Sequence, residues 1–508
     1  MSPEHRLPLE FLERVRLEVE DPEAFIASLN AQPVKSFRTN LYKTEPTFLL
    51  QTMSGIQESV PWQEGAFYVD ETFLMGRHPY HAAGLYYIQE ASAMAPVVVL
   101  DPKPGERIID LAAAPGGKST QIAERIGAEG LLVANDIDPG RLDALTQNIE
   151  RLGFLNVLIT QAEPGTLATY WPEMFDRVLL DAPCSSEGVF RKQPETIPYW
   201  SSKVVERSCK SQRLLLEAAV GLLKPGGRLV YATCTFGRAE NEAMIARFLQ
   251  EHSEIEPEPL TAEERARFPG SEKGLLDASV SPAIREATVR FWPHRSKTEG
   301  QAMIRLKKVA SSKKSGDTGL QKMPKAQFTS FAIGEKASHR EAIAILHRFL
   351  EETLPDSTIL KDRLTSRIWQ KNDRFYLLPK ALLSFPEGLN VITGLPRITL
   401  RRAGLLLGEI RKGRFVPAHA LALAQTSQDL RNMPGGHVPL TVEEAYRYLS
   451  GHTLWFHDLA CGREHTVLTG HEGRTVLVSL DHFPLGWGKI SDGQLKNHYP
   501  KGLRFLTT

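Results

Sequence analysis

Short apolar runs alternate with longer amphipathic segments between about residue 86 and residue 308. The short runs are rich in β-branched residues and predict strands near 107–112, 131–136, 157–160, 177–182 and 228–233. The longer segments have apolar residues at helical spacing and predict helices near 119–127, 139–152, 201–223 and 239–251. Strands that alternate with helices specify an α/β fold in which helices cover a parallel sheet.

The segments on either side of this region have different patterns. Residues 1–85 begin with helical periodicity and continue into an extended-looking run at 36–41, which predicts a separate α+β piece. The stretch 309–325 is poor in apolar residues and rich in Ser, Gly and Lys, so it predicts a flexible linker. Beyond it, expected helices near 339–353 and 441–450 and strand-like runs at 466–469 and 474–480 predict a β-rich accessory region.

The composition of the chain narrows its class. At 508 residues, 42% of them hydrophobic, the chain can build more than one core. Its cysteines, at positions 184, 209, 234 and 461, form no CxxC pair and no cluster with histidine, which argues against a disulfide framework and against a metal site. The sequence shows no leader and no apolar run of membrane-spanning length, so we expect a cytoplasmic protein without membrane contact.

Charge is divided unevenly between the two parts of the chain. Residues 285–508 hold 34 Lys and Arg against 20 Asp and Glu, whereas residues 1–284 hold 27 against 40. A separation of this size is more than scattered surface charge normally gives. The later part of the chain is therefore a candidate for binding a polyanion such as a nucleic acid.

A turn of small residues, from Asp110 to Lys118, lies between the first expected strand and its helix. Gly116 and Gly117 in this turn allow the backbone to approach a ligand closely. A phosphate-binding P-loop would need glycine at position 112, where the chain has Ala112, and the dinucleotide pattern GxGxxG is missing as well.

Acidic residues follow the next two strands. Asp136 comes at the end of the second strand, where a carboxylate can accept hydrogen bonds from both hydroxyls of a ribose. Glu163 comes at the end of the third strand, where it could accept a hydrogen bond from an adenine amino group. Each carboxylate alone is weak support, because acidic residues often cap helices. Together with the turn they predict a nucleoside cofactor across the carboxyl ends of strands one to three.

Two cysteines follow the fourth and fifth strands. Asp181 and Cys184 belong to an Asp-Ala-Pro-Cys sequence, and Cys234 follows Thr233, so both thiols should reach the edge of the sheet where the cofactor turn lies. A thiolate that adds to carbon 6 of a pyrimidine turns carbon 5 into a nucleophile that can accept a methyl group. Cys209 and Cys461 are interpreted as ordinary buried residues.

The other residues of this edge have expected roles in the same chemistry. Asp181 could protonate or hydrogen-bond ring nitrogen 3, and a base must afterwards remove the proton on carbon 5. One thiol would attack and the other would assist the elimination, and a cation such as Lys118 could lower the pKa of the attacking thiol. The spacing alone does not decide whether Cys184 or Cys234 attacks.

These residues resemble the Sun-family RNA (cytosine-5) methyltransferases, and the full-length pattern is similar to the RsmF type that modifies small-subunit ribosomal RNA. The motifs that carry the resemblance lie along most of the chain, at 84–92, 113–118, 181–184, 233–234, 240–242, 290–294, 483–489 and 495–500. The chain departs from the family pattern at Ala112 and at Gln301-Ala302, and we expect neither to touch the chemistry. Glu163 also departs from it, because it stands where the family more usually has the aspartate that contacts adenosine.

The resemblance implies a Rossmann-like methyltransferase sheet, an α+β N-terminal segment and a β-rich, PUA-like C-terminal region. The implied units are an RNA-binding segment at 1–85, a methyltransferase domain at 86–308, a linker at 309–325, an accessory α+β domain at 326–430 and a PUA-like RNA-binding domain at 431–508. The implied cofactor is S-adenosylmethionine, held by Ala112, Ala113, Ala114, Pro115, Gly116, Gly117, Lys118, Asp136, Glu163 and Asp181.

The resemblance also implies that Cys234 is the nucleophile and that Cys184 assists the elimination. Asp181 and Lys118 are the other two implied catalytic residues. The expected reaction is methylation of cytosine carbon 5 in ribosomal RNA, in particular 16S RNA, by a metal-free monomer that acts on the RNA or the small ribosomal subunit. Three alternatives stay open: a transfer RNA methyltransferase, a ribosome-assembly factor that binds RNA without catalysis, and a DNA cytosine methyltransferase that would attack with Cys184.

Basic and aromatic residues of the accessory region are the candidates for RNA contact. They are Arg401, Arg402, Arg411, Lys412, Arg414, Lys489, Lys496, His498, Tyr499 and Lys501, interleaved with Phe415, Trp487 and Phe505. Of the tryptophans, Trp455 and Trp487 are expected in the core.

Overall fold

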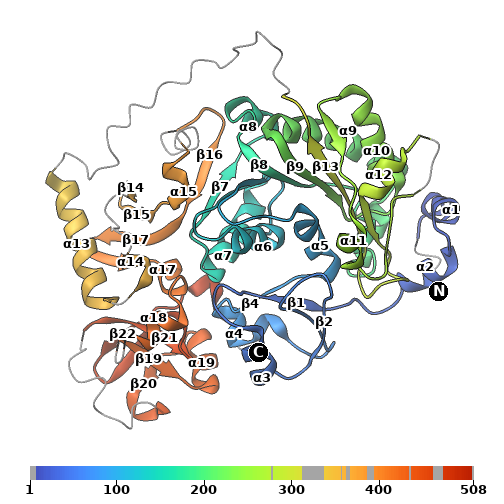
Figure 1. The fold of residues 1–508 in the computed structure, drawn as a ribbon. Helices are drawn as coiled ribbons and strands as arrows, with labels where there is room; N and C mark the ends of the chain where they lie inside the picture. Colours follow the sequence, from blue (N-terminus) through green and yellow to red (C-terminus); the bar gives the residue numbers. More distant parts are fainter. Residues whose placement is uncertain are drawn as a thin grey trace.

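Figure 1 shows a computed structural model of the chain, built around one large sheet. The structure describes residues 7–275, 279–311, 337–355, 357–361, 367–385, 394–433, 436–460 and 473–505. Most of the linker predicted at 309–325, the strand predicted at 466–469 and Cys461 lie outside the described residues.

Five parallel strands form the centre of the large sheet, in the spatial order β9-β8-β5-β6-β7. They are β5 (Arg107–Asp110), β6 (Leu131–Asn135), β7 (Val157–Gln161), β8 (Phe175–Asp181) and β9 (Leu223–Thr233). The helices that accompany them are α5 (Ala91–Leu100), α6 (Gly117–Ile126), α7 (Pro139–Leu152), α8 (Pro164–Tyr170), α9 (Ser202–Leu222) and α10 (Glu242–Glu251). The predicted parallel α/β sheet is confirmed, and each predicted strand falls on an observed one.

Antiparallel strands extend the sheet on both sides. On the β9 side the order continues through β13 (Gln301–Lys308), β12 (Thr288–Phe291) and β11 (Ser271–Glu272), and β10 (Ile255–Pro257) also pairs with β13. Two short helices, α11 (Ala262–Ala266) and α12 (Pro282–Ala287), lie between these strands in sequence. On the other side β16 (Thr399–Ala403), from the accessory region, pairs with β7.

The N-terminal segment forms a second sheet and covers the central domain. Its strands β1 (Ser36–Thr39), β2 (Ile56–Ser59), β3 (Ala66–Val69) and β4 (Tyr86–Ile88) pair in the order β2-β3-β1-β4. Its helices are α1 (Leu9–Glu18), α2 (Pro22–Ser28), α3 (Pro46–Thr52) and α4 (Pro79–Ala82). Phe11 of α1 packs edge to face against Phe190 and Trp200, in the loop that follows β8.

The accessory region contains two further sheets. The first has the order β14-β15-β17-β18, formed by β14 (Ile368–Lys371), β15 (Arg374–Leu377), β17 (Leu405–Arg411) and β18 (Arg414–Pro417). Its helices are α13 (Ala337–Thr353), α14 (Thr358–Lys361), α15 (Lys380–Leu383), α17 (His419–Leu423) and α18 (Ser427–Arg431). The second has the order β19-β21-β22-β23-β20, formed by β19 (His437–Leu440), β20 (Leu454–Trp455), β21 (Thr475–Leu480), β22 (Phe483–Ser491) and β23 (Gln494–Asn497), with α19 (Val442–Leu449).

The last sheet shares a core with residues 37–86 of the N-terminal segment, so the two sheets lie side by side (Figure 1). The ring of Phe48 lies 5.1 Å from the ring of Phe483 between their centroids. The hydroxyl of Tyr80 donates a hydrogen bond of 2.6 Å to the Asp481 carboxylate. The accessory region is therefore held at both edges, through β16 and through this shared core.

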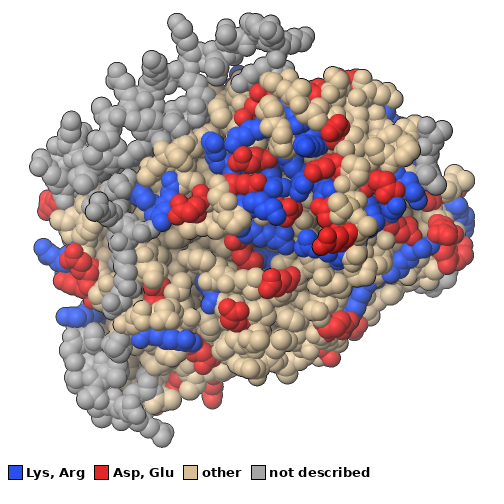
Figure 2. Space-filling model, in the orientation of Figure 1, with Lys and Arg blue, Asp and Glu red and all other residues tan. Residues whose placement is uncertain are grey.

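Positive charge is not concentrated on the face that Figure 2 shows, where basic and acidic side chains alternate over the region of β8, β9 and β13. Near the amino-terminal ends of these strands, Lys224 pairs with Asp176 at 2.6 Å and Arg228 pairs with Glu258 at 2.7 Å. This face is therefore close to neutral. In the part of the chain that the structure describes, no helix has the length and apolar character needed to cross a membrane.

The shared core predicts that the ends of the chain stabilise each other. Phe483 is 3% exposed, so Phe483→Ala should lower the free energy of unfolding by about 3 to 5 kcal/mol, the usual loss for a buried phenylalanine. Limited proteolysis should then release fragments from the N-terminal segment and from the C-terminal sheet together. The control is Leu74→Ala, at a residue that is 68% exposed, and a loss of protection at one end only would contradict the shared core.

Candidate active site

The predicted cofactor turn lies between β5 and α6 at the carboxyl edge of the sheet. Gly116 has φ of 110°, in the left-handed region that favours glycine, and α6 begins at the next residue. The Ala113 amide donates a hydrogen bond of 2.8 Å to the Asn135 carbonyl at the end of β6. The turn is thereby fixed to the neighbouring strand, and its small residues leave backbone close to the surface where a ligand would lie.

The two predicted acidic residues follow the next strands of the same edge. Asp136 is 2% exposed, and its two oxygens accept hydrogen bonds from the amides of Ala114, at 3.2 Å, and Asp138, at 3.0 Å. Glu163 is exposed, stands at the start of α8 and makes no side-chain capping bond there. The structure thus brings Ala112 to Lys118, Asp136 and Glu163 to adjacent strand ends, in the predicted order.

A third carboxylate, which the sequence interpretation did not assign to the site, lies beneath the turn. Asp110 ends β5, and its Oδ2 accepts a hydrogen bond of 2.6 Å from the Ser119 hydroxyl. Its Oδ1 is buried, and no described residue donates to it. Burial raises the pKa of Asp110 to about 7. The position of Asp110 at the end of the first strand was the sequence signal that could have assigned it to the site.

The two predicted thiols lie side by side. The parallel register of β8 and β9 pairs Asp181 with Ala232, and the chain beyond each strand carries its cysteine. The sulfur atoms of Cys184 and Cys234 are 3.4 Å apart, and both residues are partly exposed. Cys209 lies apart from them in α9, where its sulfur donates to the Ala239 carbonyl.

The environment of the two thiols separates their proton affinities. A hydrogen bond from the Cys184 thiol lowers the pKa of Cys234, and the nearby Lys118 ammonium acts in the same direction, against burial and Asp181. The same hydrogen bond, together with burial, raises the pKa of Cys184 well above its usual value. Cys234 is therefore the thiol that ionises first.

Asp181 is held by two donors. The Lys118 ammonium lies 2.6 Å from its Oδ2, and the side-chain amide of Gln301 donates a bond of 3.2 Å to its Oδ1. Burial lowers the pKa of Lys118, but the attraction of Asp181 outweighs it, so the pKa is raised and Lys118 stays a cation. Gln301, a position that was expected not to touch the chemistry, thus contacts the predicted acid.

The turn that carries Cys234 is fixed by side chains that follow it. The Thr233 hydroxyl donates to Oδ1 of Asn241 at 2.6 Å, and the amide of Asn241 donates to the carbonyls of Thr235 and Gly237. The Gly188 amide donates to the Cys234 carbonyl at 2.7 Å, and a Cβ at Gly188 would lie only 2.8 Å from that oxygen. Glycine is therefore required at position 188.

Sequence reasoning missed a buried carboxylate behind the thiols. Glu187 is fully buried and accepts hydrogen bonds from the Arg14 guanidinium at 2.7 Å, the Trp200 indole at 2.9 Å and the Phe236 amide at 2.9 Å. Burial raises the pKa of Glu187, but Arg14 and the donors outweigh it, so the pKa is lowered. Glu187 thus ties α1 to the loops that carry both thiols, a long-range link with no local sequence signal.

The structure corrects several of the predicted RNA contacts. Arg402 is 3% exposed and pairs with Glu150 at 2.6 Å, so it joins β16 to α7 and is not available to RNA. Phe415, Trp487 and Tyr499 are buried in the core and cannot serve as stacking surfaces. Trp487 was expected in the core, and this is confirmed, whereas the same expectation for Trp455 is wrong, since it is 44% exposed.

The other basic candidates lie at or near the surface. Arg401 pairs with Asp143 at 3.2 Å, across the contact between the accessory region and α7. Partly or fully exposed positions are held by Arg411, Lys412, Arg414, Lys489, Lys496, His498, Lys501 and Phe505. Within the described residues, no group of His, Cys, Asp and Glu side chains has the arrangement of a metal site.

Four family models match the chain, one after another along its length. They are described as the N-terminal domain of 16S rRNA methyltransferase RsmF (residues 7–91), 16S rRNA methyltransferase RsmB/F (97–307), the RsmF rRNA methyltransferase first C-terminal domain (348–424) and the methyltransferase RsmF PUA domain (436–505).

Known proteins are similar over nearly the whole chain. The ribosomal RNA small subunit methyltransferase F of Escherichia coli O6:H1 is 32% identical over 495 residues, which cover 94% of this chain and 92% of the relative. The protein of the same name in Escherichia fergusonii is also 32% identical, with the same coverage.

A solved structure has a similar fold over more than half of the chain. It is a methyltransferase homologue from Pyrococcus horikoshii that is 32% identical, covers 59% of this chain and 94% of its own, and has a TM-score of 0.52. The Rossmann-like sheet, the paired thiols and these matches lead to one assignment. The chain belongs to the RsmF family of 16S ribosomal RNA methyltransferases.

Proposed function

We propose that the chain transfers a methyl group from S-adenosylmethionine to carbon 5 of a cytosine in the RNA of the small ribosomal subunit. The observation that carries this proposal is the pair of sulfur atoms 3.4 Å apart, beside the Lys118 and Asp181 pair, at the edge of the sheet that also holds the cofactor turn. Membership of the RsmF family supports ribosomal RNA as the substrate class.

The residues of the turn fit this cofactor. The small side chains of 112–115 and the positive φ of Gly116 leave room for a nucleoside against the backbone, and Asp136 and Glu163 follow at the neighbouring strand ends. Asp110, at the end of β5, is buried beside this turn. When bound, S-adenosylmethionine supplies an electrophilic methyl group.

Cys234 is the proposed nucleophile. Its sulfur forms a bond to carbon 6 of cytosine, which makes carbon 5 electron-rich and able to take the methyl group. The Cys184 thiol and the Lys118 ammonium stabilise the thiolate before the attack, because both favour the anion of Cys234. These contacts support Cys234 over Cys184, whose thiol holds its proton more tightly.

The Lys118 and Asp181 pair is the proposed partner of the pyrimidine ring. A carboxylate that already accepts from Lys118 and Gln301 acts as an acceptor, so it suits the exocyclic amino group of cytosine or a protonated nitrogen 3. The Lys118 ammonium, 2.6 Å from the carboxylate, would keep its proton and donate a hydrogen bond to nitrogen 3. This differs from the expectation that Asp181 alone is the acid.

Release of the product requires a second proton transfer. A base takes the proton from carbon 5, the electron pair restores the double bond between carbons 5 and 6, and the Cys234 sulfur leaves. Cys184 is placed to assist this step, since its sulfur is 3.4 Å from the one that departs.

The proposal also covers the oligomeric state, the location and the domain organisation of the enzyme. The enzyme would act as a monomer in the cytoplasm, without a metal, on ribosomal RNA or the small subunit, and its segments 1–85, 86–308, 309–325, 326–430 and 431–508 would be its working units. A non-catalytic assembly role would not need the paired thiols and their cation, whereas a transfer RNA substrate would use the same site, so only the family membership favours ribosomal RNA over transfer RNA.

Exchanging each thiol should separate their two roles. Cys234→Ala should abolish transfer of radiolabelled methyl groups to small-subunit RNA, because the neighbouring Cys184 thiol, whose pKa is raised, does not readily form the thiolate that attacks. Cys184→Ala should still attack but release slowly, so a covalent protein and RNA adduct should accumulate and be visible by denaturing electrophoresis.

The control for this pair is Cys209→Ala, which changes a thiol outside the site and should leave methylation unchanged. Methylation by Cys234→Ala at the wild-type rate would overturn the proposed nucleophile. Binding of the cofactor by calorimetry checks that each variant is folded.

The pKa directions of the thiols predict how alkylation depends on pH. The rate of iodoacetamide labelling rises as a thiolate forms, so Cys234, with its lowered pKa, should reach half-maximal rate below the pH of about 8.5 typical of a free cysteine. In Cys184→Ala the main cause of the shift is lost, and the midpoint should move to higher pH. Cys209, whose pKa burial raises, is the internal control, and an unchanged midpoint would refute the thiol contact.

Gln301 should act as a positioning residue for Asp181. Gln301→Met removes a hydrogen bond to a charged group, worth about 1.5 to 3 kcal/mol, so kcat should fall roughly ten-fold or more while the KM for the cofactor stays nearly constant. Gln250→Met, at an exposed position of α10, is the matched control. Equal kcat in both variants would show that Gln301 only fills space.

A further inference from the structure

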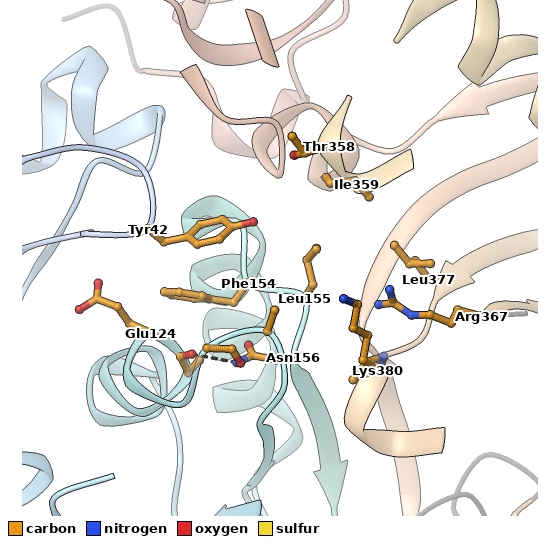
Figure 3. A pocket seen from close by; sticks show the side chains of 14 residues that line it. Tyr42, Glu124, Phe154, Leu155, Asn156, Thr358, Ile359, Arg367, Leu377 and Lys380 are labelled. Atoms are coloured by element: carbon orange, nitrogen blue, oxygen red, sulfur yellow. Dashed lines mark hydrogen bonds between the residues drawn. The ribbon is translucent and has the colours of Figure 1, made fainter. Parts of the chain in front are cut away.

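A cavity of about 150 Å³ lies where the N-terminal segment, the central domain and the accessory region meet (Figure 3). Tyr42 comes from the N-terminal segment, Phe154 and Asn156 from the connection between α7 and β7, and Arg367 and Lys380 from the accessory region. A cavity of this size holds about one six-membered ring, since an engineered cavity of about 150 Å³ binds benzene. It is distinct from the thiol site, which contributes none of its lining residues.

One wall of the cavity is aromatic. Tyr42 and Phe154 lie with their ring centroids 6.0 Å apart and their planes tilted by 41°. Phe154 is buried, but Tyr42 is 42% exposed, which is unusual for a tyrosine beside an enclosed space. A partly exposed ring at a cavity offers a face on which a planar ligand can stack.

The opposite wall carries two cations. In Figure 3 the side chains of Arg367 and Lys380 extend from the accessory region towards the aromatic pair. Arg367 donates through Nε to the Leu378 carbonyl, which fixes its guanidinium, and Lys380 lies 3.1 Å from Glu129. The lining carboxylate of Glu124 is paired with the buried Arg38 at 3.3 Å, so its charge is balanced from the other side.

The floor of the cavity includes a buried acceptor. Asn156 is 5% exposed, and its amide nitrogen donates to the carbonyls of Ala123 and Gly127, both at 2.8 Å. This fixes the orientation of the amide, while its Oδ1 is buried without a donor from any described residue. Asn156 is therefore a fixed polar side chain at the floor of the cavity.

We propose that this cavity binds one nucleotide, with a pyrimidine ring stacked on Tyr42 and the phosphate held by Arg367 and Lys380. The proposal deepens the proposed function, because an unpaired nucleotide of the RNA substrate has this chemistry, as does a free cytidine monophosphate.

The cavity lies at the opposite end of α6 from the cofactor turn. Helix α6 begins at Gly117 in that turn, and the cavity starts near Ala123 and Gly127 at its other end. With a rise of about 1.5 Å per residue, the helix places the cavity roughly 10 to 15 Å from the turn. A nucleotide in the cavity would therefore be an additional contact outside the reactive site.

Binding measurements on the full chain test this proposal with two probes, cytidine monophosphate and a ten-nucleotide single-stranded RNA rich in cytidine. Tyr42→Ala removes the stacking surface, Lys380→Ala removes a phosphate contact, and Ala128→Phe places a ring at the exposed rim to block the cavity. Each should weaken binding roughly five-fold or more, the loss expected for one stacked base. Arg374→Ala, at a 62% exposed arginine of β15 outside the cavity, is the charge-matched control and should change nothing.

Photo-crosslinking of RNA that carries 4-thiouridine locates the contact, and a crosslink at Tyr42 is expected. If the three variants weaken the binding of both probes, the nucleotide belongs to the RNA. If they weaken only the binding of cytidine monophosphate, the site serves a free nucleotide. If the three variants behave like Arg374→Ala with both probes, the proposal is overturned. Its failure is distinct from failure of the proposed function, because Cys234→Ala abolishes methylation and should leave the crosslink at Tyr42 in place.

Discussion

The site depends on the parallel pairing of β8 with β9. This register places Asp181 opposite Ala232, so the chain leaves both strands at the same edge and the next residues bring the sulfur atoms of Cys184 and Cys234 to 3.4 Å. Two thiols at this distance cannot ionise equally, because the proton of one stabilises the anion of the other. The pairing of two strands thus brings the thiols together, and the nearby Lys118 ammonium favours the anion of Cys234.

The surroundings of the thiols keep this arrangement in place. Asn241 and Gly188 bind the backbone around Cys234, and Glu187 collects donors from α1 and from both catalytic loops. The N-terminal segment therefore supports the chemistry directly. The accessory region adds β16 to the central sheet and packs its last sheet against the same N-terminal segment, so any RNA contact there is held at a fixed position relative to the thiols.

The central domain could be predicted from the sequence because its signals are local. Apolar runs mark β5 to β9, and the turn at Gly116 and the cysteines follow directly from strand ends. Contacts between distant segments had no such signal. The pairing of β16 with β7, the bond from Gln301 to Asp181 and the burial of Arg402 each depend on residues more than one hundred positions apart, or on a tertiary contact that reverses the usual preference of arginine for the surface.

Mapping a trapped covalent intermediate tests the central claim most directly. RNA in which cytidine is replaced by 5-fluorocytidine has no proton to lose at carbon 5, so the enzyme should remain bound to it after methyl transfer. Digestion and mass spectrometry of the wild-type complex should find the nucleotide on the peptide that contains Cys234. An adduct on Cys184, or no adduct while ordinary RNA is methylated, would contradict the account.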